Sequence, residues 1–187
     1  MDIAIGLDRV KYKSKPTKIQ TKNIYNRMDA HAIVSLEEFQ KAVGSGQSYR
    51  AAVINKSDLS FVSQQLFPFD FDGTPYETVL TVAKRAGIEP AVVYPTFSQS
   101  PDEPLVRYRM IFLSDHVITN ERIRNGIEQR LIKLFRPYCD ESCRHHSRLY
   151  YGGRNTIVAD FSKAYDFEKL WDIKEDSFQG WGNTKKS

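Results

Sequence analysis

The sequence predicts an α+β domain in which antiparallel strands are interspersed with helices. Two apolar stretches, "FVSQQLFPFDFDG" at 61–73 and "VRYRMIFLS" at 106–114, have the composition of strands. The stretch "NERIRNGIEQRLIKLFRPY" at 120–138 instead repeats its apolar residues at helical spacing. A chain of 187 residues, 41% of them hydrophobic, is long enough to bury one good core.

The helices are marked by residues that begin or end them. Ser35 and Glu38 have the spacing of a capping box. Pro75 stands near the first turn of the next helix, whose end is marked by Gly87. Asn120 is the expected N-cap of the long amphipathic helix. The expected helical segments are 35–44, 75–87, 120–138 and part of 162–173.

The strands are expected where β-branched and aromatic runs lie between turn residues. These segments are 50–56, 61–73, 91–98, 106–114 and 147–153. The loop "QSPDEPL" joins two of them into a plausible antiparallel hairpin. Residues 1–28 are basic and irregular, and are expected to form an arm or a loose strand. The chain therefore divides into a basic N-terminal segment, 1–34, and one main domain, 35–187.

The charge of the chain is unevenly distributed. Its net charge is +4, and residues 1–28 carry seven basic residues against two acidic ones. A second basic cluster lies in 121–154. Such clusters are typical of nucleic-acid binding and also of ordinary solvated surface. No apolar run approaches the roughly 20 residues that span a bilayer, and the N-terminus has no apolar signal segment, so we expect a cytoplasmic protein without a membrane partner.

Two aspartates interrupt the apolar run "LFPFDFDG". In a strand, Phe67, Phe69 and Phe71 point to one face, while Asp70 and Asp72 point to the other. Two carboxylates this close repel each other unless a cation lies between them. A hard cation such as Mg²⁺ accepts this ligand set. The alternative is a strand edge with two solvated acids.

Three further groups of residues fit phosphate or metal chemistry. Arg107 and Arg109 share one face of their strand, and guanidinium groups match phosphate oxygens, although a surface strand with two exposed arginines has the same pattern. Asp140 follows the long helix, and Arg148 precedes a glycine pair that allows close backbone approach. An acid and an arginine near the paired aspartates would complete a metal and phosphate site.

Two cysteines and a histidine raise the possibility of zinc. On a helix, Cys139, Cys143 and His146 would share one face and supply three ligands of zinc-binding type. The favoured alternative is that the cysteines are small buried residues near a nucleotide or DNA surface. Two cysteines form no disulfide framework and fit a reducing compartment.

The stretch "FDFDGT" at 69–74 resembles the first motif of haloacid-dehalogenase-type phosphohydrolases. That resemblance implies Asp70 as a nucleophile and Asp72 as an acid/base, within a parallel α/β sheet. This family also uses a late pair of acids, for which Asp160 and Asp166 in "VADFSKAYD" are a poor match.

Over residues 35 to 155 the chain resembles the archaeo-eukaryotic primase superfamily, in its primase-polymerase branch from plasmids, phages and other mobile elements. Four segments carry the resemblance in the same order. They are "SLEEFQKAVGSGQSYRAAV", "FVSQQLFPFDFDG", "YPTFSQSPDEPLVRYRMIFLSDHVIT" and "CDESCRHHSRLYYGG". The resemblance implies an antiparallel sheet like that of RNA-recognition modules, packed with a second α/β unit, and it makes 35–187 the catalytic domain.

The resemblance also implies roles for individual residues. Asp70, Asp72 and Asp140 would be the catalytic metal ligands. The nucleotide-binding residues would be Ser98, Arg107, Arg109 and Arg148. Many relatives have a histidine after the serine, and this chain has Gln99 there, so His116 or the arginine pair would replace the phosphate contact.

The function that this resemblance implies is template-dependent nucleotidyl transfer by a DNA primase-polymerase with two divalent ions, Mg²⁺ or Mn²⁺. Its partners would be a single-stranded DNA template, ribo- or deoxynucleoside triphosphates and a replicative helicase, fused or separate, in replication of a plasmid or other mobile element. The first alternative is the phosphohydrolase. A further alternative is a replication initiator module that binds DNA without catalysis.

Overall fold

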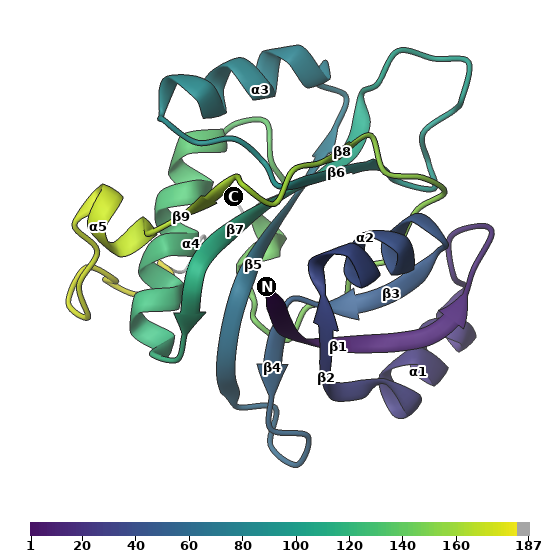
Figure 1. Ribbon diagram of the computed structural model, residues 1–187, viewed down its shortest axis with the longest axis horizontal. Coiled ribbons are helices and arrows are strands. Elements are labelled where there is room, and N and C mark those ends of the chain that lie inside the picture. Colours follow the sequence, from purple (N-terminus) through teal and green to yellow (C-terminus); the bar gives the residue numbers. More distant parts are fainter. Residues whose placement is uncertain (183–187) are drawn as a thin grey trace.

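Two sheets make up the structure, a computed structural model that describes residues 1–182 (Figure 1). The strands are β1 Asp2–Lys11, β2 Asp29–Ser35, β3 Gln47–Arg50, β4 Ala52–Ile54, β5 Phe61–Asp72, β6 Val92–Pro95, β7 Arg107–Ile118, β8 Val158–Ala159 and β9 Ala164–Tyr165. The helices are α1 Lys18–Arg27, α2 Leu36–Gly44, α3 Tyr76–Arg85, α4 Glu121–Phe135, α5 Phe167–Trp171 and the 3₁₀ turn η1 Glu141–Arg144. Figure 1 places α1 and α2 beside the smaller sheet and α3, α4 and α5 beside the larger one.

The smaller sheet has the order β2-β1-β3, with all neighbours antiparallel. Of the arm or loose strand that the sequence predicts for residues 1–28, the structure has a strand, which lies at the centre of this sheet and is followed by a helix. Asp8 of β1 is buried and accepts two hydrogen bonds of 2.7 Å from Arg27, so that basic residue is neutralised inside the fold. The boundary expected after residue 34 falls at the junction of β2 and α2, within this one unit.

The larger sheet has the order β4-β5-β7-β6-β8, and β9 adds to β7 in parallel. The expected face alternation of β5 is confirmed: Phe67, Phe69 and Phe71 are buried. The ring of Phe135 on α4 packs 5.7 Å from the ring of Phe69, between centroids, so α4 covers this face of the sheet. Asp70 lies on the opposite face of the sheet, which α4 does not cover.

The predicted caps are confirmed at the helices that surround the site. Ser35 and Glu38 form both hydrogen bonds of a capping box at α2. The side chain of Asn120 accepts backbone N–H groups at the start of α4. Gly87 has φ +79°, a left-handed conformation in which glycine costs least, just after α3.

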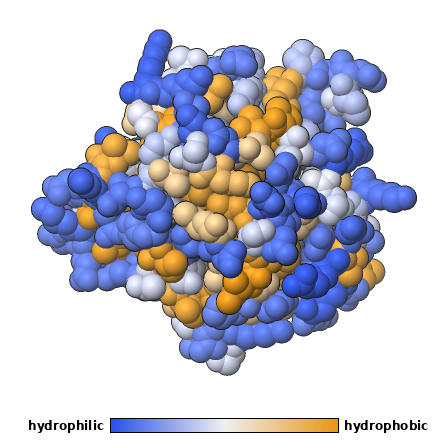
Figure 2. All heavy atoms as spheres, viewed as in Figure 1, coloured by the Kyte–Doolittle hydropathy of each residue, from blue (hydrophilic) through white to orange (hydrophobic). Residues whose placement is uncertain are grey.

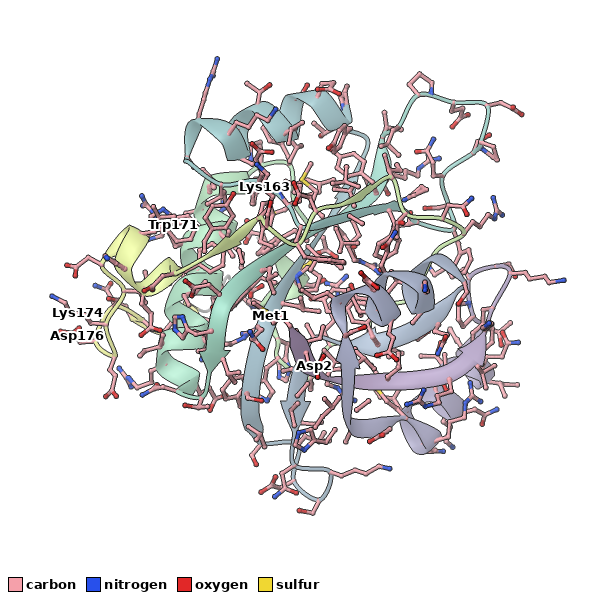
Figure 3. All side chains as sticks on the ribbon, viewed as in Figure 1. Met1, Asp2, Lys163, Trp171, Lys174 and Asp176 are labelled. Carbon is pink, nitrogen blue, oxygen red and sulfur yellow. The ribbon has the colours of Figure 1, made fainter. Side chains whose placement is uncertain are left out.

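Two expected segments differ from the structure. Residues 147–153 form no regular strand, and only Tyr150 makes an isolated bridge, to Tyr49. The C-terminal helix is limited to α5, because Ala164 and Tyr165 pair with β7 instead. Trp171 of α5 lies toward the left edge of the view in Figure 3, whereas Met1 and Asp2 lie near its middle.

The surface is mostly polar, with apolar residues gathered through the middle of the face shown in Figure 2. Within residues 1–182, no helix combines the length and the apolar character that crossing a membrane requires.

Candidate functional site

A cleft of about 540 Å³ brings together the three aspartates, the three arginines and the serine that the resemblance implies for the site. These cleft residues are Asp70, Asp72, Ser98, Arg107, Arg109, Asp140 and Arg148. They come from four places in the chain: strand β5, the loop after β6, strand β7, and the segment that follows α4. Residues up to 78 positions apart in sequence therefore meet on one face of the larger sheet.

The register of β5 and β7 places acids opposite bases. Asp70 lies across from Arg109, and Asp72 lies across from Arg107. The Nε of Arg109 donates to a carboxylate oxygen of Asp70, and the Nε of Arg107 lies 3.0 Å from a carboxylate oxygen of Asp72. Cross-strand pairs of opposite charge stabilise a sheet, so the same pairs that make the site polar also fix its register.

Arg109 lines the cleft but is almost fully buried. Its Nη1 donates to the hydroxyl of Tyr94 at 2.5 Å and to the carbonyl oxygen of Tyr151 at 2.6 Å. Its guanidinium carbon lies 4.9 Å from the ring centroid of Tyr150. Although burial alone would lower the pKa of Arg109, the charge of Asp70 and the neighbouring hydroxyls keep it raised. Arg109 is thus a fixed cation that holds Asp70.

Sequence reasoning missed the tyrosines around Arg109. Tyr94 lies directly across from Arg109 in the β6–β7 pairing, so the predicted hairpin would have identified it once its register was known. Tyr151 contributes a carbonyl oxygen, and no residue type signals that role.

Asp140 is placed next to Asp70 by the backbone. The Asp140 N–H donates to the carbonyl oxygen of Asp70 at 3.1 Å, and Cys139 forms a bridge with Phe71. The backbone N–H and hydroxyl of Ser142 bind the two Asp140 carboxylate oxygens at 2.9 and 2.7 Å. Although burial would raise the pKa of Asp140, these hydrogen bonds and the Arg148 charge hold it below its usual value.

Arg148 bridges the two acids. Its Nη2 lies 2.7 Å from Asp70 Oδ2, and its Nη1 lies 3.2 Å from Asp140 Oδ2. With the bonds from Arg109 and Ser142, both carboxylate oxygens of Asp70 and of Asp140 already accept hydrogen bonds. Arg148, which is one-fifth exposed at the cleft surface, therefore competes with any metal ion for these carboxylates.

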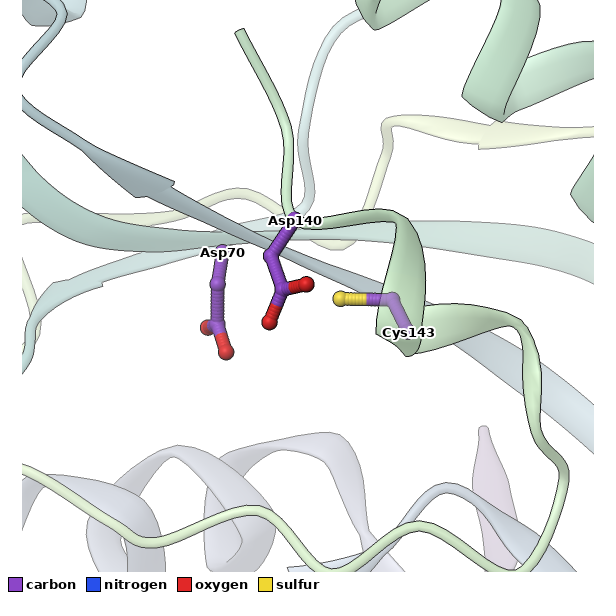
Figure 4. Close-up of side chains that lie close together, drawn as sticks. All are labelled: Asp70, Asp140 and Cys143. Atoms are coloured by element: carbon purple, nitrogen blue, oxygen red, sulfur yellow. The ribbon is translucent and has the colours of Figure 1, made fainter. Parts of the chain in front are cut away.

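The ligand atoms nonetheless fit a divalent cation. One carboxylate oxygen each of Asp70 and Asp140 and the Sγ of Cys143 lie within 4.8 Å of one another (Figure 4). Carboxylate oxygens are the ligands that Mg²⁺ and Mn²⁺ prefer. Asp72 is on the same face but outside that close group, because its exposed carboxylate turns to Arg107.

The three residues of the zinc alternative, Cys139, Cys143 and His146, are not brought together. Among the described residues, the groups that could hold a metal include neither Cys139 nor His146. The ring of His146 instead lies 3.2 Å from Glu121 and 3.0 Å from the carbonyl oxygen of Leu59. Residues 139–146 do not form one helix, so the expected shared face does not exist.

Gln99 has a structural place in the loop before β7. Its Oε1 accepts the backbone N–H groups of Val106 and Arg107 at 3.1 and 2.9 Å, and its Nε2 donates to three loop carbonyl oxygens. Ser98 lies at the cleft with its carbonyl oxygen 3.2 Å from Arg107 Nη1. The buried amide therefore shapes the loop that carries Ser98.

His116 lies outside the cleft, away from the residues to which the resemblance assigns phosphate binding. It is near the far end of β7, where its Nδ1 is 2.6 Å from Asp115 and its Nε2 is 2.7 Å from Glu168. It ties β7 to α5.

Lys15 is a further cleft residue that the sequence did not single out. It precedes α1, and Thr21 of that helix places its hydroxyl 2.8 Å from the Tyr151 hydroxyl. The N-terminal segment thus lines one wall of the cleft, a placement that depends on the docking of two units and has no local signal.

A buried ion pair, Arg124 with Glu128 on α4, contacts the segment that follows Asp140. Arg124 of α4 donates to the carbonyl oxygen of Arg144 at 2.6 Å and to Gln64 at 2.9 Å, and so anchors η1. Its partner Glu128, 3.3 Å away, has both carboxylate oxygens buried without a hydrogen bond. Burial, only partly offset by Arg124, raises the pKa of Glu128 to about 7.

The raised pKa gives a pH dependence that can be tested with Glu128→Gln. Because the folded protein holds the proton more tightly than the unfolded chain, the free energy of unfolding falls as pH rises from about 4.5 to 7, and is flat above. We expect the difference in free energy of unfolding between wild type and Glu128→Gln to decrease by up to about 3 kcal/mol as the pH rises through this range. Urea unfolding at several pH values measures it, with exposed Glu77→Gln as the control. An unchanging difference would contradict the raised pKa.

Comparisons with known proteins support the fold. No family model matches this chain, and no curated protein gives a significant match to it. Among solved structures, the AEP domain of the cyanophage S-2L primase-polymerase is similar, with a TM-score of 0.54 and 11% sequence identity. The similarity covers 91% of this chain and 88% of that one. It confirms the α+β primase-polymerase fold that the sequence motifs implied.

Proposed function

We propose that this protein is a template-dependent nucleotidyltransferase, a primase-polymerase. The observation that carries the proposal is the cleft, in which three aspartates and three arginines meet on a fold shared with a primase-polymerase domain. Nucleotidyl transfer needs acids to hold divalent ions and cations to hold a triphosphate, and this cleft presents both side by side.

The residues divide into two groups by what they contact. Asp70, Asp72 and Asp140 would hold Mg²⁺ or Mn²⁺, which when bound lowers the pKa of the attacking hydroxyl and stabilises the leaving pyrophosphate. Arg107 and Ser98 lie at the exposed side of the cleft, where the triphosphate would enter. Arg109 would keep Asp70 in place from below, and can reach a phosphate only with its remaining Nη2.

Arg148 would change partners during the reaction cycle. In the free protein its guanidinium neutralises Asp70 and Asp140. When metal takes these carboxylates, the guanidinium is released at the cleft surface, where it can bind phosphate oxygens. Binding of metal and of nucleotide would then favour each other.

The proposed setting is replication of a plasmid, phage or other mobile element, on a single-stranded DNA template and together with a replicative helicase. The support for this is the order of the four sequence motifs and the similarity to a phage protein.

The direct test is incubation with a single-stranded template, labelled nucleotides and Mg²⁺ or Mn²⁺. We expect products whose sequence is dictated by the template, release of pyrophosphate, and complete loss of product with a chelator. The control omits the template. DNA binding without incorporation in either metal would support the initiator module in place of the polymerase.

The basic residues along the N-terminal wall should contact the template backbone. Lys15 lines the cleft, and Lys18 and Lys22 are exposed on the adjoining helix α1. Replacing all three with alanine should lower the slope of log affinity against log salt. On single-stranded DNA the decrease should be about 0.7 for each phosphate that the protein no longer neutralises.

This triple variant replaces a deletion of the N-terminal residues, which would remove the central strand β1. The control is Lys84→Ala, an exposed lysine on α3 outside the cleft lining. Fluorescence anisotropy at four or more salt concentrations gives the slopes. Equal slopes in the triple variant and wild type would show that the template follows another path.

A further inference from the structure

Cys143 lies beside the two acids of the cleft, Asp70 and Asp140. Its side chain is fully buried and does not line the cleft, whereas Asp70 and Asp140 do. Figure 4 shows its sulfur directed toward the Asp140 carboxylate. Sγ and one carboxylate oxygen of each acid lie within 4.8 Å of one another.

A thiol changes which cation such a group selects. Two carboxylates alone suit Mg²⁺ and Mn²⁺, whereas a sulfur ligand adds strong preference for Zn²⁺ and related soft ions. Zn²⁺ is bound by cysteine sulfur and aspartate oxygen in a tetrahedral arrangement that can leave one position open. Here that open position would face the cleft.

Arg148 is the cation that binds these carboxylates in the free protein. Its guanidinium contacts Asp70, Asp140 and the hydroxyl of Ser142. The buried thiol adds no charge beside these carboxylates as long as it keeps its proton. A metal that displaces Arg148 therefore meets two charged oxygens and one neutral sulfur.

We propose that Asp70, Asp140 and Cys143 form a site for a thiophilic divalent cation such as Zn²⁺, which excludes Mg²⁺ from the same carboxylates and so inhibits the enzyme. The thiol proton passes to solvent as the metal–sulfur bond forms. The inhibitory part rests on the proposed function, whereas the binding site does not.

The test is titration of the protein with Cd²⁺ in the absence of nucleotide and template. A cadmium–thiolate bond produces an ultraviolet charge-transfer band, which reports the sulfur ligand directly. In wild type we expect the absorbance of this band to saturate at one equivalent of Cd²⁺ per protein. The band should be absent in Cys143→Ser. The matched control is Cys139→Ser, which removes the other buried cysteine of the same segment and should keep the band.

A second variant makes the test independent of the thiol substitution. Asp140→Asn leaves both cysteines in place, and should weaken Cd²⁺ binding at least tenfold because one anionic ligand is lost. Thermal melting verifies that each variant folds. A full band in folded Cys143→Ser, or unchanged Cd²⁺ affinity in folded Asp140→Asn, would overturn the site.

Zinc inhibition of nucleotide incorporation completes the experiment. Wild type should lose activity at Zn²⁺ concentrations at least tenfold lower than Cys143→Ser, at fixed Mg²⁺. A protein that shows the Cys143-dependent band but incorporates no nucleotide supports the site and overturns only the proposed function. A protein that incorporates nucleotides without any Cys143-dependent band overturns the site and leaves the proposed function standing.

Discussion

The Asp140→Asn variant should lose template-dependent incorporation by about 10³-fold or more, equivalent to about 4 kcal/mol of transition-state stabilisation. The substitution keeps the shape of the side chain and removes one anionic ligand from the close group that Asp140 forms with Asp70. Primer extension under single-turnover conditions measures the loss. Circular dichroism and thermal melting should remain close to wild type, because the asparagine Oδ1 can still accept the Ser142 N–H.

Asp160 offers a matched control for that variant. Its carboxylate accepts the backbone N–H and hydroxyl of Ser162, at 3.1 and 2.6 Å, just as Asp140 accepts those of Ser142. It lies outside the cleft lining. Asp160→Asn therefore repeats the local change away from the site, and incorporation should be unaffected. If Asp140→Asn incorporated nucleotides at the wild-type rate, the proposed role of Asp140 would be wrong.

The same pair of variants separates the polymerase from the phosphohydrolase. A phosphohydrolase would need Asp70 as a free nucleophile, but in this structure both its carboxylate oxygens bind arginines. It would also need a parallel sheet, and β5 instead pairs antiparallel with β4 and β7. We expect no beryllium-fluoride adduct on Asp70. Full hydrolysis of small phosphate esters by Asp140→Asn would favour the phosphohydrolase.

The local parts of this structure could be predicted from the sequence, because short-range rules govern them. The alternation that separates Phe69 from Asp70 is a property of any strand, and the caps at Ser35 and Asn120 depend on residues within one turn. The contact of Asp70 with Arg109 was not predicted, because it depends on the pairing and register of β5 against β7.

What could not be predicted depends on long-range docking. Residues 1–28 looked irregular because their many charged residues hide the alternating pattern of a strand. The strands that pair with β1 lie later in the chain, as far as Arg50. Gln99 looked like a replaced catalytic residue, and only its contacts with Val106 and Arg107 show that it shapes a loop. Cys143 was grouped with its sequence neighbours, whereas the fold turns it toward Asp70 on a distant strand.

Arg109 is expected to contribute more to stability than any other arginine of the cleft. Arg109→Ala would leave Asp70 with one fewer cation and would remove the donor to Tyr94 and to the carbonyl oxygen of Tyr151. Its side chain is 7% exposed, so water cannot replace these contacts easily. Breaking a buried ion pair from one side costs about 3–5 kcal/mol of unfolding free energy. Urea unfolding measures that loss.

Arg107→Ala is the matched control, since Arg107 makes the same kind of cross-strand pair in an exposed position. Its pair with Asp72 should be worth at most about 1 kcal/mol of stability. If Arg107 binds the triphosphate, nucleotide affinity should nonetheless fall by about 1.5–3 kcal/mol in that variant.

Arg109→Lys should restore part of the stability that Arg109→Ala loses, because an ammonium group keeps the charge but cannot direct donors to three separate acceptors. An Arg109→Ala protein as stable as wild type would show that Asp70 does not depend on this arginine, and would move Arg109 from a supporting role to a direct nucleotide contact.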